Sequence, residues 1–192
     1  SEMCIRDRHY IVSTGMKRMI EGSTIKKHVE DIWGCELIQS LDENEKFEIS
    51  EIGYTIDNTS KTRALFEINK GVNKNTKYDV NAKIKEGNRR VLFKNMIYIA
   101  DGPSDVPAFS VIKKGGGSTF AIYPKSDLKA FQQVEKLRED NRVDMYAEAD
   151  YSEGTTTYMW ITNKIYELAQ NIVNEEKSKL EASISDSPKH LT

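Results

Sequence analysis

The sequence contains few of the residues that build disulfide frameworks or zinc sites. Its two cysteines, Cys4 and Cys35, lack the paired C-x-x-C spacing, so neither a disulfide-stabilised fold nor a zinc site is expected. The three histidines are too scattered along the chain to predict a metal cluster. This cysteine usage favours a reducing, cytoplasmic location.

Long apolar runs and a strong charge of one sign are also missing. No apolar stretch approaches the roughly 20 residues that a membrane-spanning helix requires, and no basic segment followed by an apolar one marks a secretion signal. The net charge of −2 gives no electrostatic reason to expect nucleic acid or an anionic membrane as a partner. With 192 residues, of which 38% are hydrophobic and 30% charged, the composition is typical of one globular domain with a sizeable core.

The two ends of the chain differ in character from its middle. Residues 1–8 read SEMCIRDR and resemble translated sequencing-adaptor DNA, although a polar N-terminal arm is the alternative interpretation. We expect this segment to be non-native, because a strand begins directly after it with no turn or cap, and we expect part of the domain to lie upstream. The domain itself is expected over residues 9–173, followed by a charged helix end and a flexible tail over residues 174–192.

Strands and helices are expected to alternate along the chain. Short apolar or β-branched runs predict strands over residues 9–13, 35–39, 96–100, 119–123 and 143–146, with residues 47–56 forming a hairpin. Helices are expected over residues 16–22, 24–31, 59–70, 105–114, 127–139 and 154–177, the second ending at Gly34. Residues 72–95 form a long polar connection with one short element at 90–93. This order predicts an α/β fold of three α/β/α layers, Rossmann-like, around a parallel sheet.

The clearest chemical signal is the sequence IADGPSD over residues 99–105. A strand delivers Asp101 at its tip, and Asp105 follows in the first turn of a helix. Mg²⁺ prefers oxygen ligands, so Asp101 can bind the ion directly, while Asp105 can hold a ligand water or orient a neighbouring cation. Gly102 lets the backbone turn tightly beside them. An ordinary strand-to-helix turn, with Asp105 favoured by the helix dipole, explains the same residues equally well.

Two weaker signals are suited to binding a phosphate group. Ser13, Thr14 and Gly15 follow a strand and precede a helix, where a hydroxyl and free backbone N–H groups can bind an anion. Lys61 lies in the first turn of a helix, which is unfavourable for the helix dipole unless the ammonium faces inward toward phosphoryl oxygens. Helix capping by Ser13 or Thr14, and a solvated surface lysine, are the simpler alternatives.

The three signals occur in the order of the second, third and fourth motifs of the haloacid dehalogenase superfamily. Over residues 9–171 the sequence resembles the phosphoserine-phosphatase-like branch of that family. The resemblance implies a Mg²⁺-dependent phosphohydrolase that acts on a small phosphorylated metabolite through an aspartyl-phosphate. It implies that Ser13, with the Thr14 and Gly15 backbone, binds the phosphoryl group, and that Lys61 neutralises it.

By the same resemblance, Asp101 ligates Mg²⁺, and Asp105 and Ser104 support that metal site. The sequence departs from the family at its first motif, DxDx[TS], which carries the nucleophile on the central strand and does not occur upstream of Ser13. We therefore expect a gap between the strand of Ser13 and the strand that begins at Met96, with unpaired edges on both sides. The chain alone is expected to be inactive and marginally stable, with no cap domain.

Two other functions are compatible with these residues. The first is a non-catalytic module of the same fold, a pseudo-phosphatase that binds a phosphorylated ligand or a protein partner. The second is a receiver-like or nucleotide-binding Rossmann domain. The second is disfavoured because the glycine run at residues 115–117 follows a helix and precedes a strand, which is the wrong order for a dinucleotide-binding loop.

Overall fold

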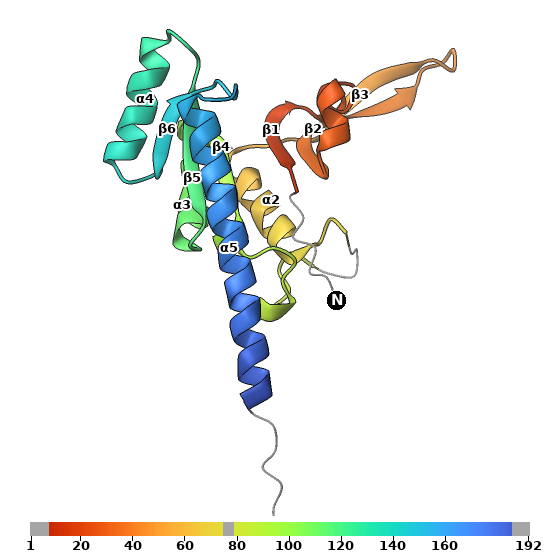
Figure 1. Ribbon diagram of the computed structural model, residues 1–192. Coiled ribbons are helices and arrows are strands. Elements are labelled where there is room, and N and C mark those ends of the chain that lie inside the picture. The colour runs from red at the N-terminus through yellow and green to blue at the C-terminus, as the bar shows by residue number, and fades with distance from the viewer. Residues whose placement is uncertain (1–7, 75–78, 186–192) are drawn as a thin grey trace, which may run out of the picture.

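The computed structural model describes residues 8–74 and 79–185 (Figure 1). Most of the N-terminal segment expected to be non-native, part of the polar connection and the last seven residues lie outside these ranges. The strands are β1 (Tyr10–Met16), β2 (Asp31–Leu41), β3 (Phe47–Tyr54), β4 (Ile97–Ala100), β5 (Ser118–Tyr123) and β6 (Met145–Glu148). The α-helices are α1 (Lys17–Glu21), α2 (Asn58–Lys70), α3 (Val106–Lys114), α4 (Leu128–Glu139) and α5 (Thr156–Ser185). Short 3₁₀ helices are η1 (Thr24–His28), η2 (Glu86–Asn88), η3 (Phe93–Asn95) and η4 (Pro103–Asp105). The expected α/β fold with parallel strands is confirmed.

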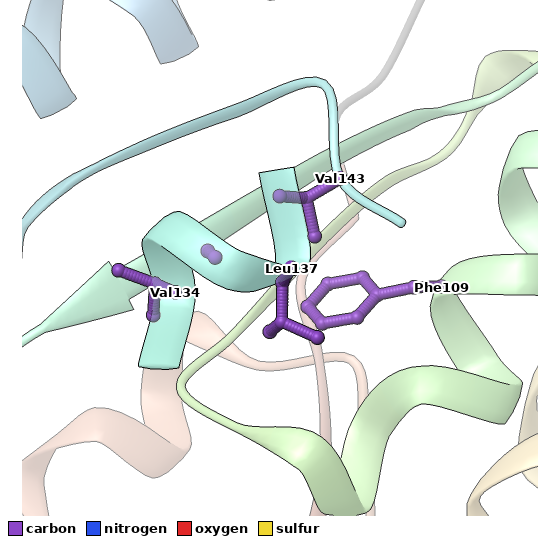
Figure 2. Packing of buried hydrophobic residues seen from close by; sticks show 5 residues of the cluster. Phe109, Val134, Leu137 and Val143 are labelled. Carbon is purple, nitrogen blue, oxygen red and sulfur yellow. The ribbon is translucent and has the colours of Figure 1, made fainter. Parts of the chain in front are cut away.

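The strands β4, β5 and β6 form a parallel sheet in that order, with helices on both of its faces. Neighbouring residues of a strand point to opposite faces, and here Ala121 packs against α3 and α4 while Phe120 stacks on Trp160 of α5 at 4.7 Å between ring centroids. Figure 2 shows the core of the first face, where side chains from α3 and α4 interdigitate. Its buried members are Phe109, Ala121, Val134, Leu137 and Val143.

The strands β1, β2 and β3 form a second sheet of different character. Strand β1 pairs with β2 in parallel, and β2 pairs with β3 in antiparallel orientation, so the expected hairpin is confirmed. The polar turn over residues 42–46 connects the two strands, with the Asp42 side chain accepting hydrogen bonds from the backbone of Asn44 and Lys46. In Figure 1 the hairpin projects away from the helices.

The expected gap between the two sheets is present. Among the described residues, β1 has its only ladder partner in β2 and β4 has its only partner in β5, so one edge of each strand is unpaired. Helix α2 connects the two sheets, because it contacts β1 and packs on α3 through Leu65, Ala108 and Ile112.

The described part of the chain contains no helix long and apolar enough to cross a membrane.

Several expectations for the first third of the chain are corrected. Thr14 and Gly15 do not follow the first strand but belong to it, because β1 continues to Met16 with a register irregularity between Val12 and Met16. Gly34 does not end a helix; it lies buried inside β2, where a Cβ atom would stand 2.9 Å from the Lys17 backbone. The helix expected over residues 24–31 is the shorter η1, since β2 begins at Asp31.

Other boundaries also differ from the expected ones. Helix α2 is capped by Asp57, whose carboxylate accepts a hydrogen bond from the Ser60 backbone in a capping box. No regular element covers residues 90–92, and η3 begins at Phe93. Strand β6 begins at Met145, because the Asp144 carboxylate accepts hydrogen bonds from the Thr119 backbone and hydroxyl. Helix α5 continues to Ser185, which is eight residues beyond the expected end.

Candidate functional site

The two predicted site residues Lys61 and Asp105 form a buried ion pair. The Lys61 ammonium lies 2.9 Å from Oδ1 and 3.0 Å from Oδ2 of Asp105, and it also donates to the Ser104 hydroxyl at 3.3 Å. Lys61 is 6% exposed and Asp105 is 2% exposed. A lysine is rarely buried so completely unless its charge is paired. The interpretation of Lys61 as a solvated surface residue is therefore wrong.

The sequence of α2 explains why Lys61 points inward. The helix begins after the Asp57 cap, and its buried apolar residues Ala64, Leu65 and Ile68 occur three, four and seven positions after Lys61. Positions with this spacing share one face of an α-helix, so Lys61 heads the stripe that packs toward α3. The position of Lys61 at the start of this stripe is a signal in the sequence for its burial.

Asp105 is held by more groups than Lys61 alone. The hydroxyl of Tyr98, on β4, donates to Asp105 Oδ1 at 2.6 Å, and the Ser104 hydroxyl donates to Oδ2 at 3.0 Å. Burial and the nearby Asp105 charge raise the pKa of Tyr98 well above its ordinary value, so this phenol stays protonated and remains a donor. Asp105 thus orients a neighbouring cation, which is one of the two roles expected for it, and the cation is Lys61.

The sequence analysis did not identify Tyr98 as a partner of Asp105 and Lys61. It lies in the apolar run MIYIA over residues 96–100, where a tyrosine reads as part of the core. Its ring does pack in the core, edge-on to Phe109 at 5.3 Å between centroids. The hydroxyl in an otherwise apolar strand was the available signal, because a buried phenol requires a hydrogen-bond partner.

Asp101 and Gly102 follow the carboxyl end of β4. Asp101 is exposed, and its backbone carbonyl accepts a long hydrogen bond of 3.4 Å from the Gln133 side chain. Gly102 is buried and has an extended backbone with φ −165°, so no special turn conformation requires a glycine there. A Cβ atom on Gly102 would lie 2.9 Å from Gln133 Nε2, the end of a flexible side chain that can move aside, so the structure shows no strict need for glycine here.

The second predicted group, Ser13 to Gly15, makes hydrogen bonds that do not involve Lys61, Asp105, Ser104 or Tyr98. The Ser13 hydroxyl accepts a hydrogen bond from the Gly15 backbone at 3.0 Å, and the Cys35 thiol donates to the Thr14 carbonyl at 3.2 Å. In the described ranges, no hydrogen bond or ion pair joins these three residues to Lys61, Asp101 or Asp105. No helix begins directly after Gly15, because Met16 still belongs to β1. The Gly15 N–H group expected to bind an anion is therefore already engaged.

The carboxylates suit a magnesium ion only in part. The described residues contain no group of three or more acidic, histidine or cysteine side chains arranged around a common point. Both oxygens of Asp105 accept hydrogen bonds from Lys61, which leaves Asp101 as the accessible carboxylate. One carboxylate with water and a phosphate is a minimal Mg²⁺ site.

Two shallow hollows, each of about 400 Å³, lie elsewhere on the molecule. One lies at the carboxyl ends of β5 and β6, beside the start of α5, and includes Glu148 and Asp150. The other lies over β2, between Lys17 and Arg63, and includes Trp33 and Glu67. Neither hollow is lined by Lys61, Asp101 or Asp105.

Comparison with known proteins gives a relative but no matching family model. No protein-family model matches the chain, and no solved structure matches it. An uncharacterized protein of Borreliella burgdorferi is 41% identical to it over 170 residues. The matching region covers 81% of this chain but 56% of the relative, so the chain spans little more than half the length of that protein.

Proposed function

We propose that this chain supplies the phosphate-binding and cation-binding part of a Mg²⁺-dependent phosphohydrolase of the haloacid dehalogenase type. The observation that carries the proposal is the buried Lys61 ammonium, held by Asp105 and Ser104 at the carboxyl end of a parallel strand. Ligands of open α/β sheets bind at this end. A positive charge fixed there suits the transfer of a phosphoryl group from a small phosphorylated metabolite.

In this proposal the two sheets are halves of one Rossmann-like sheet. The strand that carries the aspartate nucleophile would pair with the unpaired edges of β1 and β4. The 192 residues contain no D-x-D pattern, so the nucleophile would come from a segment outside them. Attack of that carboxylate on phosphorus would release the alcohol and form an aspartyl-phosphate, which water then hydrolyses to phosphate and free carboxylate.

Each site residue has a role in the proposal. Lys61 neutralises oxygens of the phosphoryl group, and Asp105, Ser104 and Tyr98 position its ammonium. Ser13, with the Thr14 and Gly15 backbone, binds the same group once the hydrogen bond between Ser13 and Gly15 opens. Asp101 would hold Mg²⁺, which when bound supplies positive charge to the phosphoryl oxygens.

A binding-only function is the second candidate. Within the described residues no group of three acidic, histidine or cysteine side chains could hold a metal ion, whereas the buried Lys61 ammonium supplies positive charge for binding a phosphate. Such a pseudo-phosphatase would use Lys61 and Ser13 in the same way. The two candidates differ in whether a phosphate monoester is hydrolysed when the longer protein is assayed.

Titration of the isotope-labelled chain with inorganic phosphate, with and without Mg²⁺, tests the proposal by NMR. We expect phosphate to shift the amide signals of Ser13, Thr14 and Gly15 and the Lys61 ammonium signal. Lys61→Met, measured where its NMR spectrum is still that of the folded chain, should weaken binding at least tenfold, whereas Lys129→Met, on an exposed face of α4, should leave it unchanged. Asp101→Asn, also at an exposed position, should remove the Mg²⁺ dependence without affecting folding.

Three outcomes would contradict the proposal. One is the absence of shifts near Lys61 at high phosphate concentration. Another is an equal loss of binding in the Lys61→Met and Lys129→Met variants, which would indicate non-specific attraction to lysines. Hydrolysis of p-nitrophenyl phosphate by the chain itself would place the nucleophile within the 192 residues and overturn its assignment to another segment.

A further inference from the structure

We infer that the β2–β3 hairpin is a dimerisation arm whose apolar face packs against the same face of a second copy of this chain. All eight residues of β3 are exposed. Phe47 is 75%, Ile52 is 70% and Ile49 is 63% exposed, although all three are large and apolar. A two-stranded hairpin is marginally stable in water on its own, and a contiguous apolar patch on a protein surface marks an interaction site.

The register of the hairpin gathers these side chains on one face. Leu41 pairs with Phe47, Gln39 with Ile49 and Leu37 with Ile52. Paired residues point to the same side of a ladder, and residues 37, 39 and 41 alternate with their neighbours, so the three pairs share a face. This apolar face consists of Leu37, Leu41, Phe47, Ile49 and Ile52, with Gln39 as its uncharged polar member.

A register shift keeps the apolar face continuous. The pairing moves by one residue between Ile38 and Gln39, so β3 contains an extra residue between Ile49 and Ile52. Without this bulge, Ile52 would point to the opposite side from Ile49, because side chains alternate along a strand. The bulge therefore restores Ile52 to the face of Phe47 and Ile49.

The charges of the hairpin favour a second copy as the occupant. None of the six residues of the apolar face is charged, although the Arg18 guanidinium donates to the Gln39 side chain at 3.0 Å. Two such faces can therefore meet through Phe47, Ile49 and Ile52 of β3 without charge repulsion in a two-fold arrangement. The opposite face carries Ser40, Glu48 and Glu51, with Ile38 as its apolar member, and two copies of that face would repel each other. The hairpin also projects away from the other elements, which leaves room for a second arm (Figure 1).

The size of the face matches a small dimer interface. Burying the exposed parts of Leu41, Phe47, Ile49 and Ile52 would remove roughly 500 Å² per copy, or about 1,000 Å² in total, from water. That area is near the lower limit for a specific protein–protein interface. We therefore expect a dimer that dissociates on dilution rather than an obligate one.

Sedimentation velocity of the full chain over a range of concentrations tests this inference. We expect the mass to rise toward twice 22.0 kDa with concentration. Ile49→Lys, on the apolar face, should stay at the monomer mass. The matched variant Ser40→Lys, which places the same charge on the opposite face beside Glu48, should still form the dimer.

Three results would overturn the inference. A wild-type chain that stays monomeric at its highest soluble concentration would assign the face to another occupant, such as a further part of a longer protein. A dimer that survives Ile49→Lys would place the interface elsewhere. Hydrogen exchange gives a readout that needs no variant: amides of residues 37–41 and 47–52 should become more protected as concentration rises, and unchanged protection would also refute the dimer.

Discussion

The two sheets of this protein each have three strands, yet they are stabilised in different ways. In the β4–β5–β6 sheet, the β5 residues Thr119, Phe120 and Ala121 are fully buried between helices on two faces. In the β1–β2–β3 sheet, every residue of β3 is exposed. The difference teaches that strand pairing alone does not bury a sheet; helices or a partner must cover its faces.

The strand sequences already contain this contrast. Residues 119–123, TFAIY, are almost continuously apolar, which is typical of a strand buried on both faces. Residues 47–52, FEISEI, mix apolar and acidic side chains, which is typical of a strand with one face in water. In the structure the apolar side chains of this strand are exposed, Phe47 by 75%, Ile49 by 63% and Ile52 by 70%.

The largest expected effect is a matched pair of phenylalanine truncations. Phe109→Ala, in the core shown in Figure 2, should lower the free energy of unfolding by about 3–5 kcal/mol, because it removes buried contacts and leaves a cavity. Phe47→Ala on the hairpin should change it by less than about 0.5 kcal/mol when measured on dilute protein. Urea unfolding curves measure both. Equal losses of unfolding free energy in the two variants would mean that Phe47 is as well buried as Phe109, and the contrast between the two sheets would then be wrong.

The next largest effect concerns the buried ion pair between Lys61 of α2 and Asp105 before α3. Lys61→Met should cost about 3 kcal/mol, because it leaves the Asp105 carboxylate buried without its cation. The double variant Lys61→Met with Asp105→Asn should cost less than the sum of the two single changes, since both groups are then neutral and the new amide oxygen can still accept from the Tyr98 hydroxyl. A double-mutant cycle from urea unfolding measures this coupling. Strict additivity would show that the two groups do not interact.

The smallest effect is a dependence of stability on pH in the better-packed half. Burial tends to raise the pKa of Asp144, but hydrogen bonds from Thr119 and the Lys113 ammonium lower it below its ordinary value. Because the folded-state pKa is depressed, the stabilisation is complete above about pH 4 and is lost as the pH falls through the folded-state value. Since Asp144 is partly exposed, the contribution should be under about 1 kcal/mol.

Asp144→Asn should therefore reduce stability at pH 7 and flatten the further loss as the pH falls below about 4, both measured by denaturant unfolding at each pH. Asp140→Asn serves as the matched control, because Asp140 is exposed beside the end of α4 and its side chain holds no comparable bonds. If both variants follow the wild-type pH profile, Asp144 is not a source of the acid sensitivity.

Much of the fold could be predicted from the sequence. The apolar runs gave β4 and β5 to within one residue, and Asp127 and Gly71 gave the start of α4 and the end of α2. The errors have tertiary causes. Gly34 is the usual residue to end a helix, but here it lets the β1 backbone approach β2 closely. No local pattern distinguishes these two uses of glycine.

For the candidate site, too, the sequence predicted the local positions of the residues but not their contacts. The sequence by itself predicted Lys61 and Asp105 each in the first turn of a helix, and it predicted the apolar stripe of Ala64, Leu65 and Ile68 that follows Lys61. In the structure Asp105 lies just before α3. Only the packing of α2 on α3 brought ammonium and carboxylate, 44 residues apart, to 2.9 Å, with the Tyr98 hydroxyl beside them. The physical reason is that an ion pair gains its strength from removal of water, and burial depends on how whole elements pack rather than on any local run of residues.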